Sequence, residues 1–247
     1  MSTNFEPLSQ LEISERVFPT AAVAAAQSTS TRKSASNGNR PSTHSEALNL
    51  VQRVFLYRPE MAPQVVVFTS PQSGTGCSWV CARTAEVLAE HFPEDVCVVD
   101  CNLRSPAMHR YFHVDNNRGL AQALARKEPI LDYVQEARSQ KISVLTTGAP
   151  SVEMMPSLSN SMVQRLTELR QRFTYLLIDS PATNLYADVA LLSPVSDGAI
   201  LVLEADSTRR DAALQAKDLL LAAKFQLLGA AINKRTFHIP EFIYHRL

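Results

Sequence analysis

The sequence predicts an α/β fold of three layers, in which helices cover both faces of a mostly parallel central sheet. Short, almost wholly apolar segments alternate with amphipathic helical segments along most of the chain, as expected of a parallel sheet buried on both faces. A loop of small residues, 70–77, joins one such strand to the start of a helix. Acidic residues end two further strands, and in this fold class functional groups gather at the carboxyl ends of the strands.

The order of the elements follows from the periodicity of the apolar residues. The folded part begins with a helix at Ser45, in which Leu48, Val51 and Phe55 recur at helical spacing. We predict strands at 65–69, 96–100, 142–146, 175–179, 199–204 and 227–233. We predict the remaining helices at 78–91, 120–125, 162–171, 187–192 and 208–223.

The chain divides into a tail and one domain. Residues 1–44 are expected to be disordered, because 27–44 is rich in Ser, Thr, Asn, Arg and Pro and has few apolar side chains to offset the ordering entropy. Residues 45–247 are expected to form the domain. The chain has 247 residues and is 45% hydrophobic, which suffices for one large α/β domain.

Charge and hydropathy narrow the classes of function. The 24 basic residues balance the 24 acidic ones, so nucleic-acid binding has little electrostatic support. No uninterrupted apolar run approaches the ~18 residues that a membrane helix needs, and 1–16 has no signal-peptide core. We therefore expect a cytoplasmic chain that does not insert into a membrane.

The loop after the first strand has the layout of a phosphate-binding loop, in which backbone N–H groups cradle nucleotide phosphates. Gly74 and Gly76 permit a tight turn near phosphate oxygens, with Thr75 between them. Such loops end in a lysine and then a hydroxyl residue. Ser78 supplies the hydroxyl, but Cys77 stands where the lysine is expected. The loop predicts a nucleotide-binding architecture that lacks the cation holding the β- and γ-phosphates.

Two strands end in aspartates that can serve a metal ion beside this loop. The strand 96–100 ends in Asp100, and 175–179 ends in Asp179 in the manner of a Walker B strand. With Ser78 these carboxylates form a candidate Mg²⁺ site, and both are candidate catalytic residues if the protein is active. The alternative is structural, since an aspartate can cap a loop and Ser78 can bond the backbone at the helix start.

Four cysteines occur, at positions 77, 81, 97 and 101, and in a cytosolic α/β protein they are expected to be reduced. If their strands are neighbours, Cys77 and Cys101 can approach each other at the loop. A metal or redox site is one interpretation, and buried apolar filler is the other. Because Cys77 lies at a helix N-terminus, we expect its pKa to be lowered.

Further motifs follow the loop in a fixed order. In sequence they are 69–78, like a Walker A; 99–106, like a Walker A′; 108–112; 118–120; 145–148; 178–181, like a Walker B; 188–190; 197–198; 208–211; and 228–234. This collinear set, from about 45 to 233, resembles the cytoplasmic kinase domain of the bacterial tyrosine kinases (BY-kinases) of capsule and exopolysaccharide export, relatives of the Min/Par-type deviant Walker ATPases. The resemblance implies a P-loop NTPase-like fold, ATP or ADP and Mg²⁺ as cofactors, and adenine recognition by Asn233.

The chain departs from the pattern of that family at four places. Cys77 replaces the P-loop lysine, and Asn102 replaces the second acid of the Walker A′ motif. The segment 46–52 lacks both arginines of the family's oligomerisation helix, so the sequence leaves homo-oligomerisation open. A lone Tyr244 replaces the C-terminal tyrosine cluster, which is the autophosphorylation substrate in the family.

Three functions remain open at the level of sequence. The first is an inactive or weakly active member that regulates or scaffolds a membrane polysaccharide co-polymerase, which it meets in trans at the inner face of the cytoplasmic membrane. The second is an active ATP-dependent tyrosine kinase or ATPase, in which Lys127, Lys141 or Lys234 supplies the missing cation, although none of them belongs to the loop. The third is a Min/Par-like positioning ATPase. The lost lysine, acid and tyrosines together favour the first.

Overall fold

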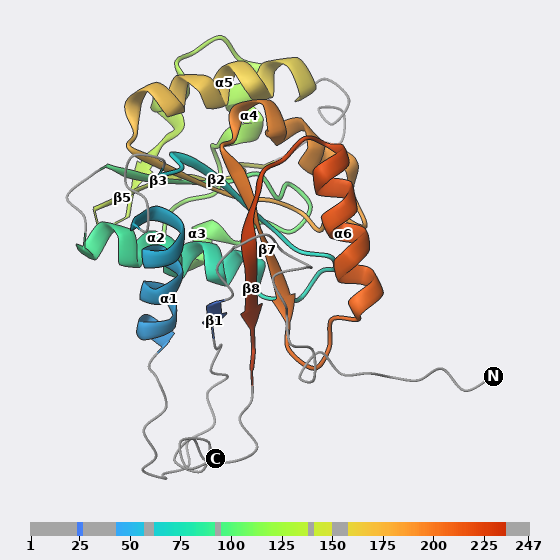
Figure 1. Ribbon diagram of the computed structural model, residues 1–247. Coiled ribbons are helices and arrows are strands. Elements are labelled where there is room, and N and C mark those ends of the chain that lie inside the picture. Colours follow the sequence, from blue (N-terminus) through green and yellow to red (C-terminus); the bar gives the residue numbers. More distant parts are fainter. Residues whose placement is uncertain are drawn as a thin grey trace, which may run out of the picture.

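The chain builds an eight-stranded sheet with helices on both faces (Figure 1). The structure is a computed structural model, and it describes residues 24–26, 43–56, 62–91, 95–137, 141–149 and 158–235. The strands lie in the order β1-β8-β7-β2-β6-β3-β5-β4, and all neighbours are parallel except β4 and β5. Their bounds are β1 Ala24–Ala26, β2 Val65–Thr69, β3 Val96–Asp100, β4 Gln135–Glu136, β5 Ile142–Leu145, β6 Tyr175–Asp179, β7 Gly198–Glu204 and β8 Leu227–Asn233.

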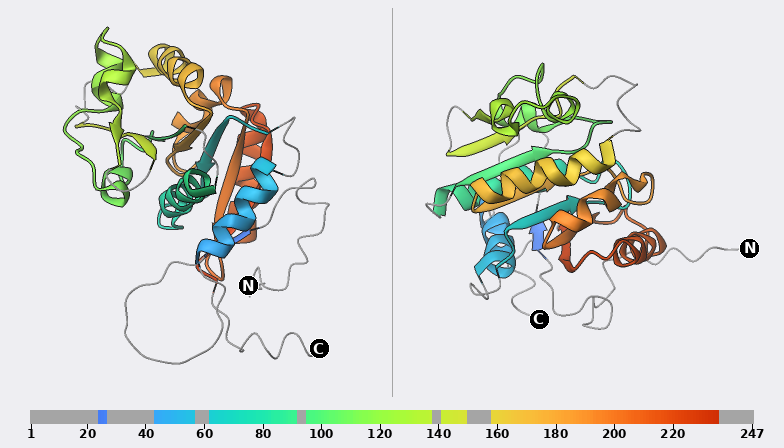
Figure 2. Two further views of the ribbon diagram at one scale, coloured as in Figure 1. Left: turned by 90° about the vertical axis from the view of Figure 1, so that its left-hand side faces the viewer. Right: turned by 90° about the horizontal axis from the view of Figure 1, so that it is seen from above.

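The helices divide between the two faces. One face carries α1 (Thr43–Val51), its π-helical continuation η2 (Gln52–Leu56), α2 (Cys77–His91) and α3 (Met108–Phe112). The other carries α4 (Leu120–Ala125), η4 (Ile130–Tyr133), α5 (Leu158–Arg172), η6 (Ala187–Val195) and α6 (Arg210–Ala222). Figure 2 shows the sheet between these two layers. The three-layer fold with a mostly parallel sheet is therefore confirmed.

Alternation along the strands produces the two apolar cores. In β2, Val65 and Val67 pack into the core beneath α5 and α6, whereas Val66 and Phe68 pack into the core beneath α1 and α2. Successive side chains of a strand point to opposite faces, so a strand covered on both faces is apolar throughout. All five residues of β2 are buried.

Several predicted elements differ in type or extent. The segment 187–195 is a 3₁₀ helix rather than an α-helix, and Pro194 within it has no N–H to donate to an α-helical bond. Helix α6 begins at Arg210 rather than at residue 208, and the Thr208 hydroxyl instead accepts a hydrogen bond from the N–H of Glu204, the last residue of β7. The short elements α3, η4 and β4 were not predicted, because each is too short to show periodicity.

Residues 1–44 were expected to be disordered, and the structure describes two short parts of this segment. Residues 24–26 form β1, which pairs with β8 in parallel, and residues 43–44 belong to the first turn of α1. At these five residues the expectation is not met, and the rest of 1–44 lies outside the described residues. Tyr244 lies outside them as well.

The sheet order decides which side chains surround the loop after β2. This strand lies between β6 and β7, so Asp179 lies beside its carboxyl end on one side, and on the other β7 continues past that end to Glu204. Beyond β7 lies β8, where Asn233 is paired in register with Glu204. Beyond β6 lies β3, where Asp100 is in register with Asp179. The side chains of Asp100, Asp179, Glu204 and Asn233 thus gather at the carboxyl edge of the sheet, beside the loop.

Candidate functional site: a phosphate-binding loop without its lysine

The loop between β2 and α2 has the backbone shape that its glycines predict. Gly74 has a φ of 87° and Gly76 a φ of 83°, a region that L side chains rarely adopt. A Cβ at Gly76 would lie 2.1 Å from Asn233 Nδ2, so this glycine also permits close approach of β8. The first helical hydrogen bond of α2 runs from Val80 N to Gly76 O (3.0 Å). The loop therefore leads directly into a helix N-terminus, as a phosphate site requires.

The end of β8 holds this loop by its carbonyl groups. Asn233 donates from Nδ2 to Thr75 O at 2.7 Å, and Lys234 donates from Nζ to Gly74 O at 2.6 Å. Lys234 also pairs with Glu204 at 3.0 Å between Nζ and Oε1. Of the three lysines considered from sequence, Lys234 is thus brought to the loop. In a phosphate cradle the N–H groups face the ligand, so a side chain bound to the carbonyls lies against the outer side of the loop.

The candidate metal ligands lie beside the first turn of α2. Ser78 donates from Oγ to Asp179 Oδ2 at 2.6 Å, which joins the loop to the end of β6. The other oxygen of Asp179 is buried, and no donor among the described residues reaches it. A hydroxyl and a carboxylate oxygen are ligands that Mg²⁺ prefers, so Ser78 and Asp179 fit the ion that the sequence predicts.

Asp100 is engaged differently. Its Oδ1 accepts from Asn102 N at 3.1 Å, and its Oδ2 accepts from Ala107 N (2.8 Å) and Met108 N (3.0 Å). These N–H groups belong to the turn after β3 and to the start of α3. Asp100 therefore caps the loop after β3, which is the structural alternative considered in the sequence analysis. A role in metal binding would be in addition to this one.

The two aspartates form a buried pair of like charges. Both are fully buried, and burial is the largest cause that raises their pKa values. The pKa of Asp100 is raised to about 6, and three backbone N–H bonds moderate that rise. The pKa of Asp179 is raised well above its usual value by burial and by the charge of Asp100. A cation bound at Asp179 would relieve both effects.

Cys77 contributes a buried thiol, not a reactive one. Its side chain lies in the core beneath α2, and its pKa is raised by burial and then by the neighbouring charge of Asp179. The expected lowering of this pKa at a helix N-terminus is wrong, because desolvation and a carboxylate outweigh the helix dipole. Cys81 lies near both Cys77 and Cys101. The thiols at positions 77 and 101, which were expected to approach each other, therefore share Cys81 as a common neighbour. All four cysteines are reduced and buried.

Asn233 carries the feature that fits adenine. It is fully buried, and within the described part of the chain nothing donates to its side-chain oxygen. That oxygen can accept a hydrogen bond from an exocyclic amine, while Nδ2 remains on the loop. The hydroxyl of Thr75 is also buried and has no partner among the described residues. These orphaned polar atoms gather at the loop, which is where a nucleotide would satisfy them.

Sequence reasoning missed the connection between Glu204 and Lys234. Glu204 ends β7 and Lys234 follows β8, so both lie at the same carboxyl edge as the loop. A lysine directly after a strand end, in a parallel sheet, was the available signal.

In the part of the chain that the structure describes, no helix is both long enough and apolar enough to cross a membrane.

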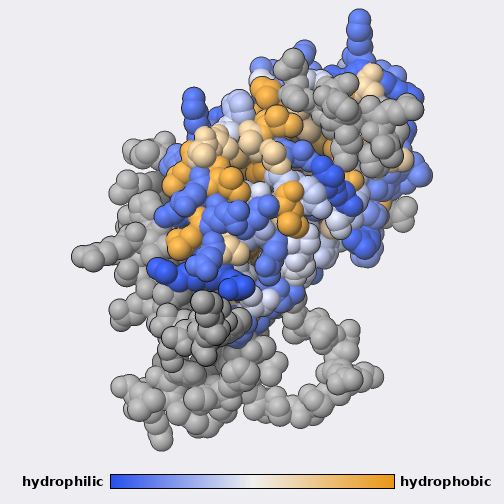
Figure 3. Space-filling view, turned by 90° about the vertical axis from the view of Figure 1, so that its right-hand side faces the viewer, coloured by the Kyte–Doolittle hydropathy of each residue, from blue (hydrophilic) through white to orange (hydrophobic). Residues whose placement is uncertain are grey.

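Figure 3 shows the face that carries α6, on which polar and apolar residues are interspersed. Leu219 and Leu221 of this helix are about half exposed, at 42% and 50%.

Comparisons with known proteins find similarity to bacterial tyrosine-protein kinases. No family model matches it. It is 31% identical over 182 residues to the tyrosine-protein kinase YwqD of Bacillus subtilis, covering 73% of this chain and 76% of that one. It is 24% identical over 173 residues to the tyrosine-protein kinase CpsD of Streptococcus agalactiae, covering 69% and 75%.

Solved structures share the fold. The chimerical protein CapA2B2 superposes with a TM-score of 0.77 at 22% identity, covering 90% of this chain and 98% of that one. The kinase domain of the Escherichia coli tyrosine kinase ETK gives a TM-score of 0.75 at 20% identity, covering 89% and 93%. The septum site-determining protein MinD of Pyrococcus horikoshii, complexed with Mg-ADP, gives 0.60 at 23%, covering 69% and 70%.

Proposed function

The chain belongs to the bacterial tyrosine-protein kinase family, and from that membership we propose that it is a degenerate member which binds nucleotide but transfers phosphoryl groups weakly or not at all. Its role would be to regulate or scaffold a membrane polysaccharide co-polymerase in capsule or exopolysaccharide synthesis. The observation that carries the proposal is the Cys77 side chain, buried against Asp179 where the family has a lysine.

Charge is the reason to expect weak catalysis. Phosphoryl transfer depends on positioning and on neutralising the negative charge that develops in the transition state. Cys77 supplies no cation, and the Nζ of Lys234 is engaged by Gly74 O and Glu204. By analogy with removing one transition-state donor, we expect a loss on the order of 10²–10³ in rate. Asn102 cannot replace a carboxylate as a base or a charged ligand.

The residues that remain fit a bound nucleotide with Mg²⁺. Ser78 and Asp179 would hold the ion, the N–H groups of 74–78 would bind the phosphates, and Asn233 would orient adenine. Mg²⁺ supplies neutralising charge to phosphate oxygens when it is bound. Binding would therefore relieve the repulsion between Asp100 and Asp179, whether or not chemistry follows.

The proposed partner is a membrane polysaccharide co-polymerase, reached in trans from the cytoplasmic side. The support is family membership, together with the likeness to YwqD and CpsD, each of which matches over about three quarters of its length. Copurification with a co-expressed co-polymerase tests it. Retention of the complex by an Asp179→Ala variant would agree with a scaffolding role, and loss of the complex would tie it to nucleotide binding.

Phosphotransfer from radiolabelled ATP tests the proposed weakness directly. We expect the wild-type chain with Mg²⁺ to label neither itself nor a tyrosine peptide above the level of Asp179→Ala, with Asp218→Asn on α6 as a surface control. Robust labelling that Asp179→Ala abolishes and Asp218→Asn retains would overturn the proposal.

A restoration test examines the loop itself. Cys77→Lys should strengthen binding of ADP·Mg²⁺ by roughly tenfold or more in calorimetry, since a hydrogen bond to a charged group contributes about 1.5–3 kcal/mol. Cys77→Met is the matched control, because it lengthens the side chain without adding charge. Equal affinities of the two variants would contradict the view that only a cation is missing.

One observation favours a second function, an active kinase or ATPase. Lys234 already lies at the loop, 2.6 Å from Gly74 O, and it could turn from this carbonyl to a bound phosphate. In that case Lys234→Met would abolish turnover that the wild-type chain performs. A Min/Par-like positioning role rests on shared fold alone, through MinD.

A further inference from the structure

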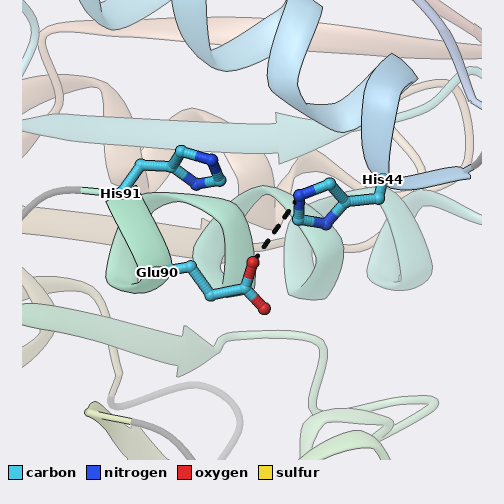
Figure 4. A group of neighbouring side chains, drawn as sticks. All are labelled: His44, Glu90 and His91. Carbon is cyan, nitrogen blue, oxygen red and sulfur yellow. Dashed lines mark ion pairs between the residues drawn. The ribbon is translucent and has the colours of Figure 1, made fainter.

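Three side chains on the face opposite α5 and α6 converge far from the P-loop. They are His44 in the first turn of α1 and Glu90 and His91 in the last turn of α2, and all three are exposed (Figure 4). Each offers one ligand atom within 4.8 Å of the others. Among the residues that the structure describes, this is the one group of at least three histidine, cysteine or acidic side chains with that spacing.

The spacing suits ligands of one ion. The distance between His44 Nε2 and Glu90 Oε2 is 3.6 Å. Two ligand atoms bonded at about 2.1 Å to a tetrahedral ion lie about 3.4 Å apart, so this pair needs almost no movement. The two imidazole rings lie side by side, with centroids 5.6 Å apart and planes inclined by 38°.

A backbone carbonyl orients the second histidine. His91 Nδ1 lies 3.1 Å from Val87 O, one turn back along α2. With Nδ1 as the donor, Nε2 carries the lone pair that binds metals, and a carbonyl on the other ring nitrogen is the usual support of a metal-binding histidine. Figure 4 shows the two rings and the Glu90 carboxylate as neighbours, with the ion pair between His44 and Glu90 dashed.

The donor set selects the ion. Two imidazoles and one carboxylate suit Zn²⁺ and neighbouring first-row cations better than Mg²⁺ or Ca²⁺, which prefer oxygen ligands throughout. Three protein ligands leave a position for water or for a group from a partner.

We propose that His44, Glu90 and His91 form a Zn²⁺ site that fastens the start of α1 to the end of α2. The two helices already share one apolar core, in which Ala47 and Val51 of α1 lie with Ala85 and Leu88 of α2. A metal at their exposed ends would cross-link them outside this core. It would make the position of α1 dependent on Zn²⁺, independently of whether nucleotide binds.

Calorimetric titration of the metal-stripped full chain with Zn²⁺ tests the site. We expect one ion per chain, and affinity at least tenfold weaker in His44→Ala, His91→Ala and Glu90→Gln, since losing even a supporting partner of a ligand costs 10–100-fold. His113→Asn is the control, because His113 is another exposed histidine and asparagine tolerates its left-handed backbone (φ 53°). The four cysteines are present in every variant, so binding to thiols cancels in the comparison.

Hydrogen exchange supplies a readout of the cross-link. Zn²⁺ should slow amide exchange in 43–51 of the wild-type chain and of His113→Asn, and should leave it unchanged in His91→Ala. Unchanged Zn²⁺ affinity in all three ligand variants would overturn the proposal and reduce the cluster to an ion pair between His44 and Glu90. Slower exchange in 43–51 of His91→Ala as well would overturn it too.

Discussion

The ammonium group of Lys234 lies 2.6 Å from the carbonyl oxygen of Gly74, across 160 residues of sequence. The loop that lacks its own lysine is therefore held by a lysine from the end of β8, on the side of the carbonyls. Together with the amide of Asn233 on Thr75 O, this contact ties the loop to the end of β8.

Removing this contact should loosen the loop. Lys234→Met is expected to lower the free energy of unfolding by about 1 kcal/mol, because the Lys234 side chain is 35% exposed and solvent screens part of its interaction. Urea unfolding measures the change, and Lys127→Met, at an exposed position, is the control. Hydrogen exchange should also accelerate in 72–78 of the Lys234 variant alone. Equal stability of the two variants would show that Lys234 does not hold the loop.

The two loop glycines should respond differently to alanine. At Gly74 only the φ of 87° disfavours alanine, since nothing lies within 4 Å of an added Cβ. We expect the free energy of unfolding to fall by about 1 kcal/mol. At Gly76 a Cβ would also lie 2.1 Å from Asn233 Nδ2, so we expect a loss of about 3 kcal/mol or displacement of Asn233. Chemical denaturation of the two variants compares them. Equal losses of stability in the two variants would mean that Asn233 of β8 does not restrict the size of the residue at position 76.

The buried carboxyl groups of Asp100 and Asp179 are expected to make the folded protein less stable as the pH rises. The folded-state pKa values of Asp100 and Asp179 are raised above the ~3.9 of an unfolded aspartate. The folded state then binds more protons, so the pair's contribution to stability falls as pH rises from about 4 through about 6 and beyond.

Asp179→Asn should remove most of this penalty. We expect its advantage in thermal midpoint over the wild-type chain to grow from pH 5 to pH 8, whereas Asp218→Asn on α6 keeps a constant difference. If the advantage of Asp179→Asn did not vary with pH, the carboxylates of Asp100 and Asp179 would not destabilise the folded state when they ionise.

Thiol chemistry checks the environment of the P-loop cysteine. Because burial and Asp179 raise the pKa of Cys77, we expect a disulfide reagent at pH 8 to label the native chain only as fast as it opens. All four thiols should react in denaturant. Rapid labelling of one thiol in the native chain, lost in Cys77→Ser, would contradict this environment and restore the reactive cysteine that the sequence suggested.

The sequence predicted the fold and the loop because both depend on local patterns. Apolar runs such as 65–69 and the glycines at 74 and 76 carry their own conformational signals. Other features of the site depend on contacts between segments that are distant in the sequence. That Lys234 reaches Gly74, and that Asp100 caps the start of α3, follows from strand order and side-chain direction, which no short motif contains. The type of helix formed by 187–195 depends on Pro194 near its end.

In the proposed function, the chain retains a nucleotide cradle but has lost the cation of its phosphate-binding loop. A crystal structure with a non-hydrolysable ATP analogue and Mg²⁺ would show whether both statements hold. We expect adenine at Asn233, Mg²⁺ at Ser78 and Asp179, and the Lys234 ammonium still on the Gly74 carbonyl. A basic side chain bound to the terminal phosphate, beside a fully ligated Mg²⁺, would contradict the second statement.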